Sequence, residues 1–424
     1  MKAKLLFTFL SILICQKLAA QVYLEKQTRH RFAQMNLGLD YQTNFGGKTA
    51  YIDADGNRKS LALGQLHKPR FLIGGTHFWG HADFYIAIPL YSPTFKKENQ
   101  VVNYLSGVET VFKYYPLKIE SQKIRPFIGT SVAAFYFEQN NNNLEFGNGP
   151  ELNHTSLPLL AGLTFDHKSH LFEAGVLWNY ANKQDYYISK TDIANIRTPP
   201  LYLTLSYRLM FDTTISAEKS WESGRTDEVT QLLADKKRLN SFYIGAGLSS
   251  AFWMSKSSYN AVNRPYLPKY NTSIMPDFSL GYYMHQPDMN IALTYRGYGT
   301  STNTYGTIQV LHRESAGLEA TKFLFDYHGF VPFVGPVLTY EQLSFDESFE
   351  NQRTAGVSEN KLGYGITFGW DIRPNRIQTW LLRTNLRWFP KLDLPIDNGQ
   401  SISFNGIEFN FIQLVVYPGR MMKR

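Results

Sequence analysis

Residues 201–211 read LYLTLSYRLMF, a segment in which every second side chain is large and apolar. Leucine, tyrosine and phenylalanine form one face of the extended chain, and mainly tyrosine, threonine, serine and arginine form the other. In a β-strand, successive side chains point to opposite sides. An apolar face opposite a polar face over about ten residues is typical of a strand in a transmembrane β-barrel. The segment therefore predicts a strand with a lipid-facing and a lumen-facing side.

The same alternation recurs along the chain, for example in residues 82–92, 360–371 and 377–389. It predicts sixteen strands in two sets of eight. In the first half the expected strands are 31–43, 69–79, 82–92, 104–115, 124–138, 155–166, 170–181 and 199–211. In the second half they are 240–252, 273–285, 289–299, 313–326, 330–344, 360–371, 377–389 and 402–417.

The connections between these strands alternate in length. In each half the second, fourth and sixth connections are short, as at 80–81 and 286–288, and the others are mostly long and rich in Asn, Gly, Ser and Lys. Outer-membrane barrels have short periplasmic turns and long outer loops. A soluble β-sandwich, the alternative, gives no reason for such regular alternation. The pattern favours the barrel.

Short matches in the same order indicate that the two halves are copies of one eight-strand unit. They fall on the fourth, fifth and sixth expected strand of each half. The matched pairs are GVE at 107–109 with GLE at 317–319, PFIG at 126–129 with PFVG at 332–335, and GLTF at 162–165 with GITF at 365–368.

The first twenty residues indicate export. Lys2 and Lys4 precede an apolar run from Leu5 to Cys15, and small residues end at Ala20. This is the pattern of a cleaved signal peptide, and the run is too short to cross a bilayer. We expect residues 1–20 to be removed after Ala20. Removing its three lysines lowers the formal net charge from +8 to +5.

The remaining composition excludes several classes of protein. Cys15 is the only cysteine, so the mature chain can form no disulfide framework or thiolate metal site. The modest positive charge is scattered, which argues against nucleic-acid binding. Aromatic residues make up 15% of the chain, although the mean hydropathy is only −0.29. An exported chain of this kind can still span a membrane if its strands close into barrels.

We expect four segments: the signal peptide at 1–20, a first eight-strand β-barrel repeat at 21–211, a linker at 212–238 and a second eight-strand repeat at 239–424. The linker carries Thr226 and Asp227 as helix-start residues and then leucines at helical spacing. By strand parity it is periplasmic, and it is expected to form a short helix that serves as a connector, a plug or a docking element.

The extended strand that leaves a short turn at Arg125-Pro126-Phe127-Ile128-Gly129 resembles the small outer-membrane β-barrel family typified by the eight-stranded membrane domain of OmpA. Val331-Pro332-Phe333-Val334-Gly335 repeats it, and the first half ends on Phe211 like the aromatic-ended strand read by the barrel-insertion machinery. The resemblance covers nearly all of the mature chain through its topology. It implies an all-β antiparallel transmembrane barrel in the bacterial outer membrane, with outer-membrane lipid and that machinery as partners.

Sixteen strands can form two tandem eight-stranded barrels or one sixteen-stranded barrel. Eight strands enclose a space that side chains fill, whereas sixteen leave an aqueous channel. The long linker and the signal-like strand ending at Phe211 favour two barrels. Charges of both signs fall on the expected inner faces, where buried charges must be paired. This expected lumen charge network comprises Asp40, Glu109, Glu173, Arg208, Arg296, Glu319, Arg383, Arg387 and Glu408.

Signals for chemistry are weak. Residues 53–57 (DADGN) contain aspartates as a calcium loop does, but no glutamate stands at position 64, so a hairpin turn in an outer loop is the better interpretation. His77 and His81 are expected near the periplasmic rim. His154 and Ser156 have the positions, but not the surrounding motif, of a lipid-modifying barrel enzyme. We therefore expect no catalytic residue, metal site or cofactor.

Three functions remain. The favoured one is a non-enzymatic outer-membrane barrel that is structural or binds partners through its long outer loops. The alternatives are a porin-like diffusion channel, which needs one continuous lumen, and a lipid-modifying barrel enzyme.

Overall fold

The computed structural model describes residues 33–97, 99–141, 148–212, 225–253, 255–270, 274–327, 329–373, 379–397 and 399–420. The expected signal peptide lies outside this part of the chain. The described residues are mostly β-strand, which confirms the all-β class. No helix among them is long and apolar enough to cross a bilayer.

Eight strands of the first half form what we call the N-terminal ring. Each pairs antiparallel with two others, and the β1–β14 and β7–β8 pairings return the sheet to its start. The order around the ring is β1-β4-β5-β7-β8-β10-β11-β14. The strands are β1 Ala33–Asn44, β4 Leu66–His77, β5 Ala82–Pro89, β7 Gln100–Tyr114, β8 Lys123–Asn141, β10 Leu159–His167, β11 His170–Trp178 and β14 Leu201–Asp212.

Eight strands of the second half form a closed barrel, here called the C-terminal barrel. Neighbours in the chain are neighbours in the barrel, and β24 closes it against β15. The strands are β15 Ser241–Trp253, β16 Met275–Met284, β17 Met289–Thr304, β18 Thr307–Phe323, β19 Phe330–Phe349, β20 Gln352–Ile372, β21 Trp380–Phe389 and β24 Gly406–Val416.

Shorter elements complete the chain. A small sheet in the order β12-β13-β2-β3 extends the ring at the end opposite the tight turns. Its strands are β2 Lys48–Ile52, β3 Arg58–Ala62, β12 Lys183–Tyr187 and β13 Ile193–Arg197. The others are β6 Thr94–Lys97, β9 Asn148–Ser156, β22 Asp393–Asp397, β23 Gln400–Ser403, α2 Arg225–Asp235, α3 Ser258–Asn263 and the 3-10 turn η2 Pro418–Arg420.

The prediction of outer loops is wrong at several places, because the strands continue through the residues expected to form them. Residues 300–312 and 345–359 belong to long hairpins that end in tight turns at Tyr305-Gly306 and Glu350-Asn351. All four turn residues have positive φ, between 52° and 78°, the conformation of two-residue hairpin turns that match strand twist. The exposed side of these extensions is mainly polar, for example at Ser301, Asn303 and Asp346, so it carries no lipid-facing signal.

Two expected strand limits also change. The strand expected at 155–166 is divided at Leu157-Pro158 into β9 and β10, because proline has no N–H to continue the ladder. The strand expected at 402–417 begins only at Gly406, after the separate β22–β23 hairpin. The expected hairpin turn at 53–57 is present between β2 and β3, where the Asp53 carboxylate accepts the Asn57 N–H at 2.7 Å.

The outer walls carry large apolar side chains and the interiors carry polar ones. Leu203 and Leu205 of the ring are 46% and 61% exposed, and Leu362 of the barrel is 70% exposed. The residues between them in sequence point inward and are largely buried. We call the apolar zone around both walls the apolar band. Its alternation with buried polar residues is the one expected for strands that face lipid.

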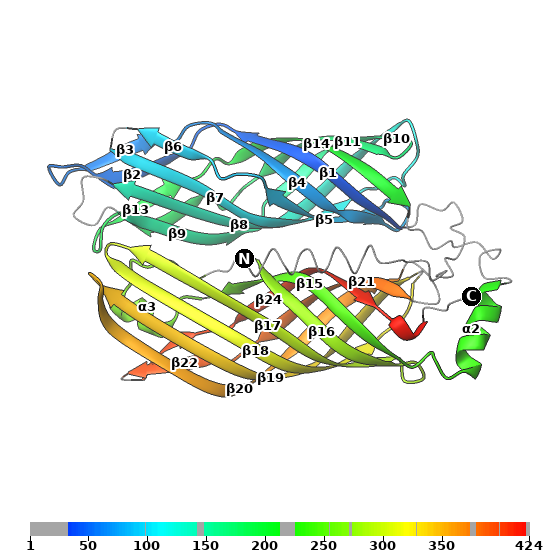
Figure 1. Cartoon of the computed structure of the whole chain (residues 1–424). Helices are drawn as coiled ribbons and strands as arrows, with labels where there is room; N and C mark the ends of the chain where they lie inside the picture. Colours follow the sequence, from blue (N-terminus) through cyan, green and yellow to red (C-terminus); the bar gives the residue numbers. More distant parts are fainter. Residues whose placement is uncertain are drawn as a thin grey trace, which may run out of the picture.

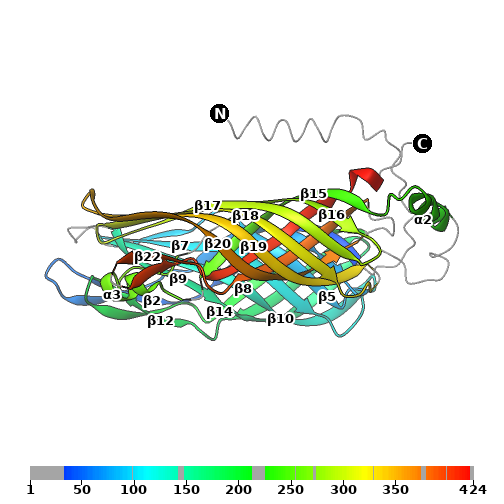
Figure 2. The same cartoon turned by 90° about the horizontal axis from the view of Figure 1, so that it is seen from below.

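The ring and the barrel lie side by side with their long axes roughly parallel (Figures 1 and 2). Their tight turns share one end, next to α2, and the long hairpins share the other (Figure 1). Their walls touch through an apolar cluster in which Ile86 of the ring packs with Phe409 and Phe411 of the barrel. Near the tight turns, the rings of Phe78 and Phe330 lie 5.3 Å apart.

Candidate functional site

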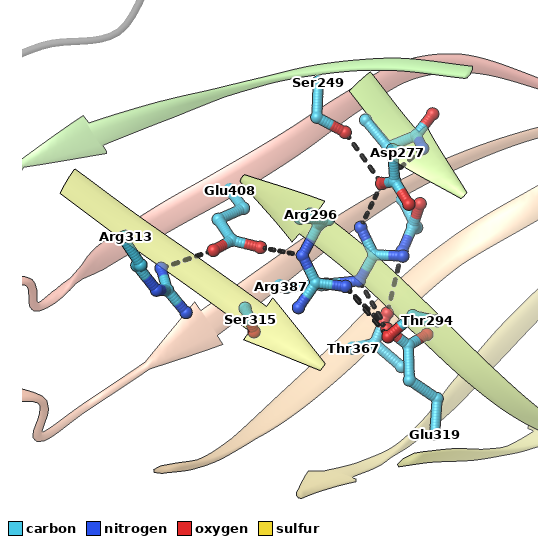
Figure 3. A network of polar contacts seen from close by, with 12 residues as sticks. Ser249, Asp277, Thr294, Arg296, Arg313, Ser315, Glu319, Thr367, Arg387 and Glu408 are labelled. Carbon is cyan, nitrogen blue, oxygen red and sulfur yellow. Dashed lines mark hydrogen bonds and ion pairs between the residues drawn. The ribbon is translucent and has the colours of Figure 1, made fainter. Parts of the chain in front are cut away.

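The C-terminal barrel holds a continuous network of ion pairs (Figure 3). Glu408 joins two arginines, Arg296 at 2.7 Å and Arg313 at 2.5 Å. Glu319 joins Arg296 at 3.3 Å and Arg387 at 2.6 Å. These side chains come from strands on different sides of the barrel, so the network crosses its interior.

The network continues to both sides of this centre. Arg387 also pairs with Asp277 at 2.6 Å, and Asp277 accepts hydrogen bonds from Ser249 and Asn410 at 2.8 Å (Figure 3). Toward the tight turns, Arg383 holds Asp371 through two bonds of 2.7 and 2.9 Å. Such forked arginine–carboxylate pairs fix both partners in one geometry.

The N-terminal ring has its own network. Arg70 binds the Asp40 carboxylate through both of its oxygens, at 2.8 and 2.5 Å, and also pairs with Glu109. Glu173 accepts bonds from Lys113 at 2.9 Å and from Arg208 at 2.6 Å. These side chains are at most 9% exposed. The pairing offsets the large cost of removing each charge from water.

The structure places all nine residues of the expected lumen network inside the two halves, and each takes part in an ion pair. Four residues lie in the ring and five in the barrel, so they form two separate groups. Sequence reasoning missed most of their partners, although these residues follow the same inward alternation. The missed partners are Arg70, Asp83, Lys113, Asp277, Arg313 and Asp371.

Apolar cores lie beyond the ion pairs at the end with the long hairpins. In the ring, Val102 and Phe137 pack with Leu61, Tyr186 and Ile196 of the small sheet. In the barrel the corresponding core combines residues of the strand extensions with the loop after β15 and the β22–β23 hairpin, namely Trp253, Tyr270, Leu343, Phe345, Leu394, Ile402 and Phe404. We call these two clusters the outer caps.

Polar contacts fix the cap of the barrel. The Asn260 amide of α3 donates to Tyr270 at 2.8 Å and to Gln309 at 3.0 Å. Arg264 pairs with Glu347 at 2.8 Å. Burial raises the pKa of Tyr270, so its phenol remains a hydrogen-bond donor at neutral pH. The cap is thus a small packed core in which polar contacts join α3 and the loop after it to the barrel strands.

The two halves also touch beyond the apolar band, through polar groups. Tyr305, in the turn between β17 and β18, donates its N–H to the Asn148 carbonyl of β9 at 2.6 Å. Thr304 donates its hydroxyl to Glu151 at 3.1 Å. Burial raises the pKa of Glu151 to about 7, and the neighbouring Glu138 adds to the shift while Thr304 opposes it. The barrel therefore covers the edge of β9.

The weaker candidates for chemistry do not form a catalytic arrangement. His154 and Ser156 both line a cavity of about 50 Å³ in the ring. Gln184 lies 3.3 Å from the His154 ring, but no hydrogen bond between His154 and Ser156 occurs in the described part of the chain. His77 and His81 flank the tight turn after β4, at the expected rim. No cluster of metal-ligating side chains occurs among the residues that the structure describes.

No protein-family model and no curated protein matches this sequence. Solved structures with a similar course of the chain include Neisserial surface protein A, with 17% identity, a TM-score of 0.30, and coverage of 42% of this chain and 96% of that one. An outer membrane channel from Pseudomonas putida F1 has 8% identity, a TM-score of 0.20, and coverage of 90% and 94%. A Pseudomonas aeruginosa FadL homologue has 8% identity, a TM-score of 0.20, and coverage of 91% and 88%. These low scores add nothing to the fold, which rests on the strand pairings above.

Proposed function

We propose that the chain is an integral protein of the bacterial outer membrane, made of two tandem eight-stranded barrels that stand side by side. The apolar band, the polar interiors and the expected export signal support this location. The tight turns and α2 then face the periplasm, and the long hairpins and outer caps face outward. The barrel-insertion machinery and outer-membrane lipid are the expected partners.

The function that fits best is non-enzymatic: a structural barrel pair, or a platform that binds partners through its outer elements. The observation that carries this proposal is that paired charges cross each lumen and that an outer cap lies beyond them. A diffusion channel needs a continuous aqueous path. Positive and negative charges are nearly balanced in each lumen, so neither lumen offers an excess of one sign to attract a solute ion.

The experiment has two parts. Cells that express the protein are fractionated, and Sarkosyl-insoluble, heat-modifiable protein in the outer membrane is the expected result. The purified protein is then placed in liposomes for a swelling assay with small sugars, with a known porin as the positive control. We expect no swelling above empty liposomes. Recovery in the soluble periplasmic fraction would refute the location, and swelling at the porin rate would establish the porin-like alternative.

We also propose that the two halves arose by duplication. The three matched tetrapeptide or tripeptide pairs lie on β7 and β18, on β8 and β19, and on β10 and β20. Glu109 and Glu319, the last residues of the first matched pair, both form ion pairs with arginines inside their lumens.

The proposal that the protein is not an enzyme is tested by a lipid-modification assay, in which we expect no product.

A further inference from the structure

Three exposed cationic side chains form one row across the small sheet of the ring. Lys183 on β12 lies directly opposite Arg197 on β13, and Arg197 lies directly opposite Lys48 on β2. All three are exposed. Directly opposite residues share one face of a sheet, with Cβ atoms roughly 5 Å apart, and like charges in that position repel each other. We call these residues the cation row.

The cation row lacks counter-charges. None of its members forms an ion pair in the described part of the chain. The nearest carboxylate on the same face, Asp185, accepts a hydrogen bond from Asn195. The row borders a hollow of about 410 Å³ whose lining also includes Arg58 and Lys59 but no carboxylate. Lys59 pairs with Asp53 at 3.5 Å, and the other four cations form no ion pair among the described residues. An excess of cations around a hollow fits an anion with several oxygens.

The sheet beneath the row is held rigid. Its opposite face packs into the outer cap of the ring through Tyr186 and Ile196. The Tyr186 hydroxyl donates to the Ala50 carbonyl at 3.0 Å, which joins β12 to β2. The backbone positions that carry the three cations are therefore fixed close together, which reduces the ordering needed when an anion binds.

The row also lies just beyond the apolar band. The β1–β14 ladder ends at Asn44 and Tyr202, and the Lys48–Arg197 pair continues it outward with a shift of one residue. Exposed apolar side chains occur a few residues away on each connection: Phe45 before Lys48, Tyr180 before Lys183 and Leu201 after Arg197. At this height, a barrel in a membrane meets lipid headgroups, where lysine and arginine side chains are attracted to anionic lipid.

We propose that the cation row binds the phosphate groups of a phosphorylated glycolipid in the outer leaflet of the membrane. The hollow receives the phosphorylated sugar, and the acyl chains run along the apolar wall below Phe45 and Leu201. This inference rests on the proposed outer-membrane location. Binding is tested on purified protein, so its failure is distinguishable from a failure of the location, which fractionation measures separately.

The test uses the full chain in detergent and measures retained lipid by native mass spectrometry. The probes are diphosphoryl lipid A and its dephosphorylated form. We expect wild-type protein to retain the diphosphoryl form at least tenfold better, and the triple variant Lys48→Gln/Lys183→Gln/Arg197→Gln to lose this preference. Binding should also weaken in 0.5 M salt, which screens exposed charges.

A matched control removes three exposed lysines from other outer positions. Lys96→Gln/Lys97→Gln/Lys391→Gln changes the net charge equally and should bind like wild type. Heat-modifiability verifies that each variant is folded. If the triple variant does not fold, the single variant Lys183→Gln is used in its place, and it should bind diphosphoryl lipid A several-fold more weakly than wild type. Equal retention by the triple and control variants overturns the proposal. Binding of soluble polyphosphate as tightly as the lipid would also overturn the proposal, because the ligand would then be a soluble polyanion.

Discussion

Tyr41 on β1 lies directly opposite Leu205 on β14, so the first and last strands of the N-terminal ring are paired. Cysteines at these two positions should form a disulfide in the full-length protein, because directly opposite residues of antiparallel strands lie within disulfide reach. The mature chain has no other cysteine to interfere. The comparison is the pair Tyr41→Cys/Ile412→Cys, which tests a single sixteen-strand barrel. Crosslinking of only that second pair, measured by gel mobility, would contradict the ring.

The N-terminal half should fold without the rest of the chain. A fragment of residues 21–215 behind a signal peptide contains all eight strands of the ring, so no open strand edge remains in lipid. Its newly exposed wall residues, such as Phe84 and Ile86, are apolar and can face lipid. We expect monomeric, heat-modifiable fragment in the membrane. A fragment that assembles only as a dimer would show that its edges need a partner.

A charge on the outer wall should destabilise the ring. Leu203 is 46% exposed and is the third residue of β14, so Leu203→Arg should cost less than the roughly 2–4 kcal/mol of a midplane position but more than the roughly 0–1 kcal/mol of a position at the interface. Leu203→Met, which stays apolar, is the control. Urea unfolding in lipid vesicles measures both. If the arginine variant is as stable as the methionine variant, this face does not contact lipid.

Breaking one lumen pair should be costly, whereas removing both partners should cost less. Arg383→Met leaves Asp371 buried with only the more distant Arg373, at 3.9 Å, and the loss should be about 3–5 kcal/mol. Adding Asp371→Leu removes the buried carboxylate and should restore part of the stability, because Arg373 then loses its ion pair. The midpoints of urea unfolding of the two variants, measured in lipid vesicles, test both expectations. Equal stability of the single and double variants would mean that water reaches Asp371.

The polar contact between the halves should weaken as the pH rises. Burial raises the pKa of Glu151 to about 7, so its neutral form is favoured in the folded state. Its contribution is fully present below the unfolded pKa of about 4.3 and is lost as the pH rises through 7. Hydrogen exchange of the Tyr305 amide, corrected for intrinsic rate, should be faster at pH 8 than at pH 5.5. Glu151→Gln should remove this difference, and a difference that persists would assign the effect to another group.

Alternation of apolar and polar residues predicts most of this fold, because it records which side of each strand faces lipid. The expected lumen residues follow from it directly: Glu109 and Glu173 point inward because their neighbours in sequence point outward. The same rule applies to Arg70 and Arg313, but both lie at the ends of expected strands, where the inward or outward direction of a side chain is hardest to assign. They are missing from the predicted lumen network because the strand limits are uncertain.

Other features have no local signal. Beyond the apolar band the exposed side of the strands is mainly polar, so the extensions of β17–β20 lack the apolar outer face that identifies the rest of each strand. Pairing across a lumen joins residues far apart in the chain, as Arg313 and Glu408 are, and depends on which strands are opposite one another. The contact between the ring and the barrel likewise depends on how the two lie relative to each other. The lumen pairings and this contact are therefore determined only once the barrels are assembled.

The wall contact built on Ile86, Phe409 and Phe411 has a consequence for the energetics of association. Two such walls on separate molecules would compete with lipid, which covers apolar surfaces equally well, and would separate readily. Here a single chain joins them through the linker between β14 and β15, and a flexible linker holds two binding partners at an effective concentration of up to about millimolar. A contact of modest intrinsic affinity is then made most of the time, and the two barrels move as one unit.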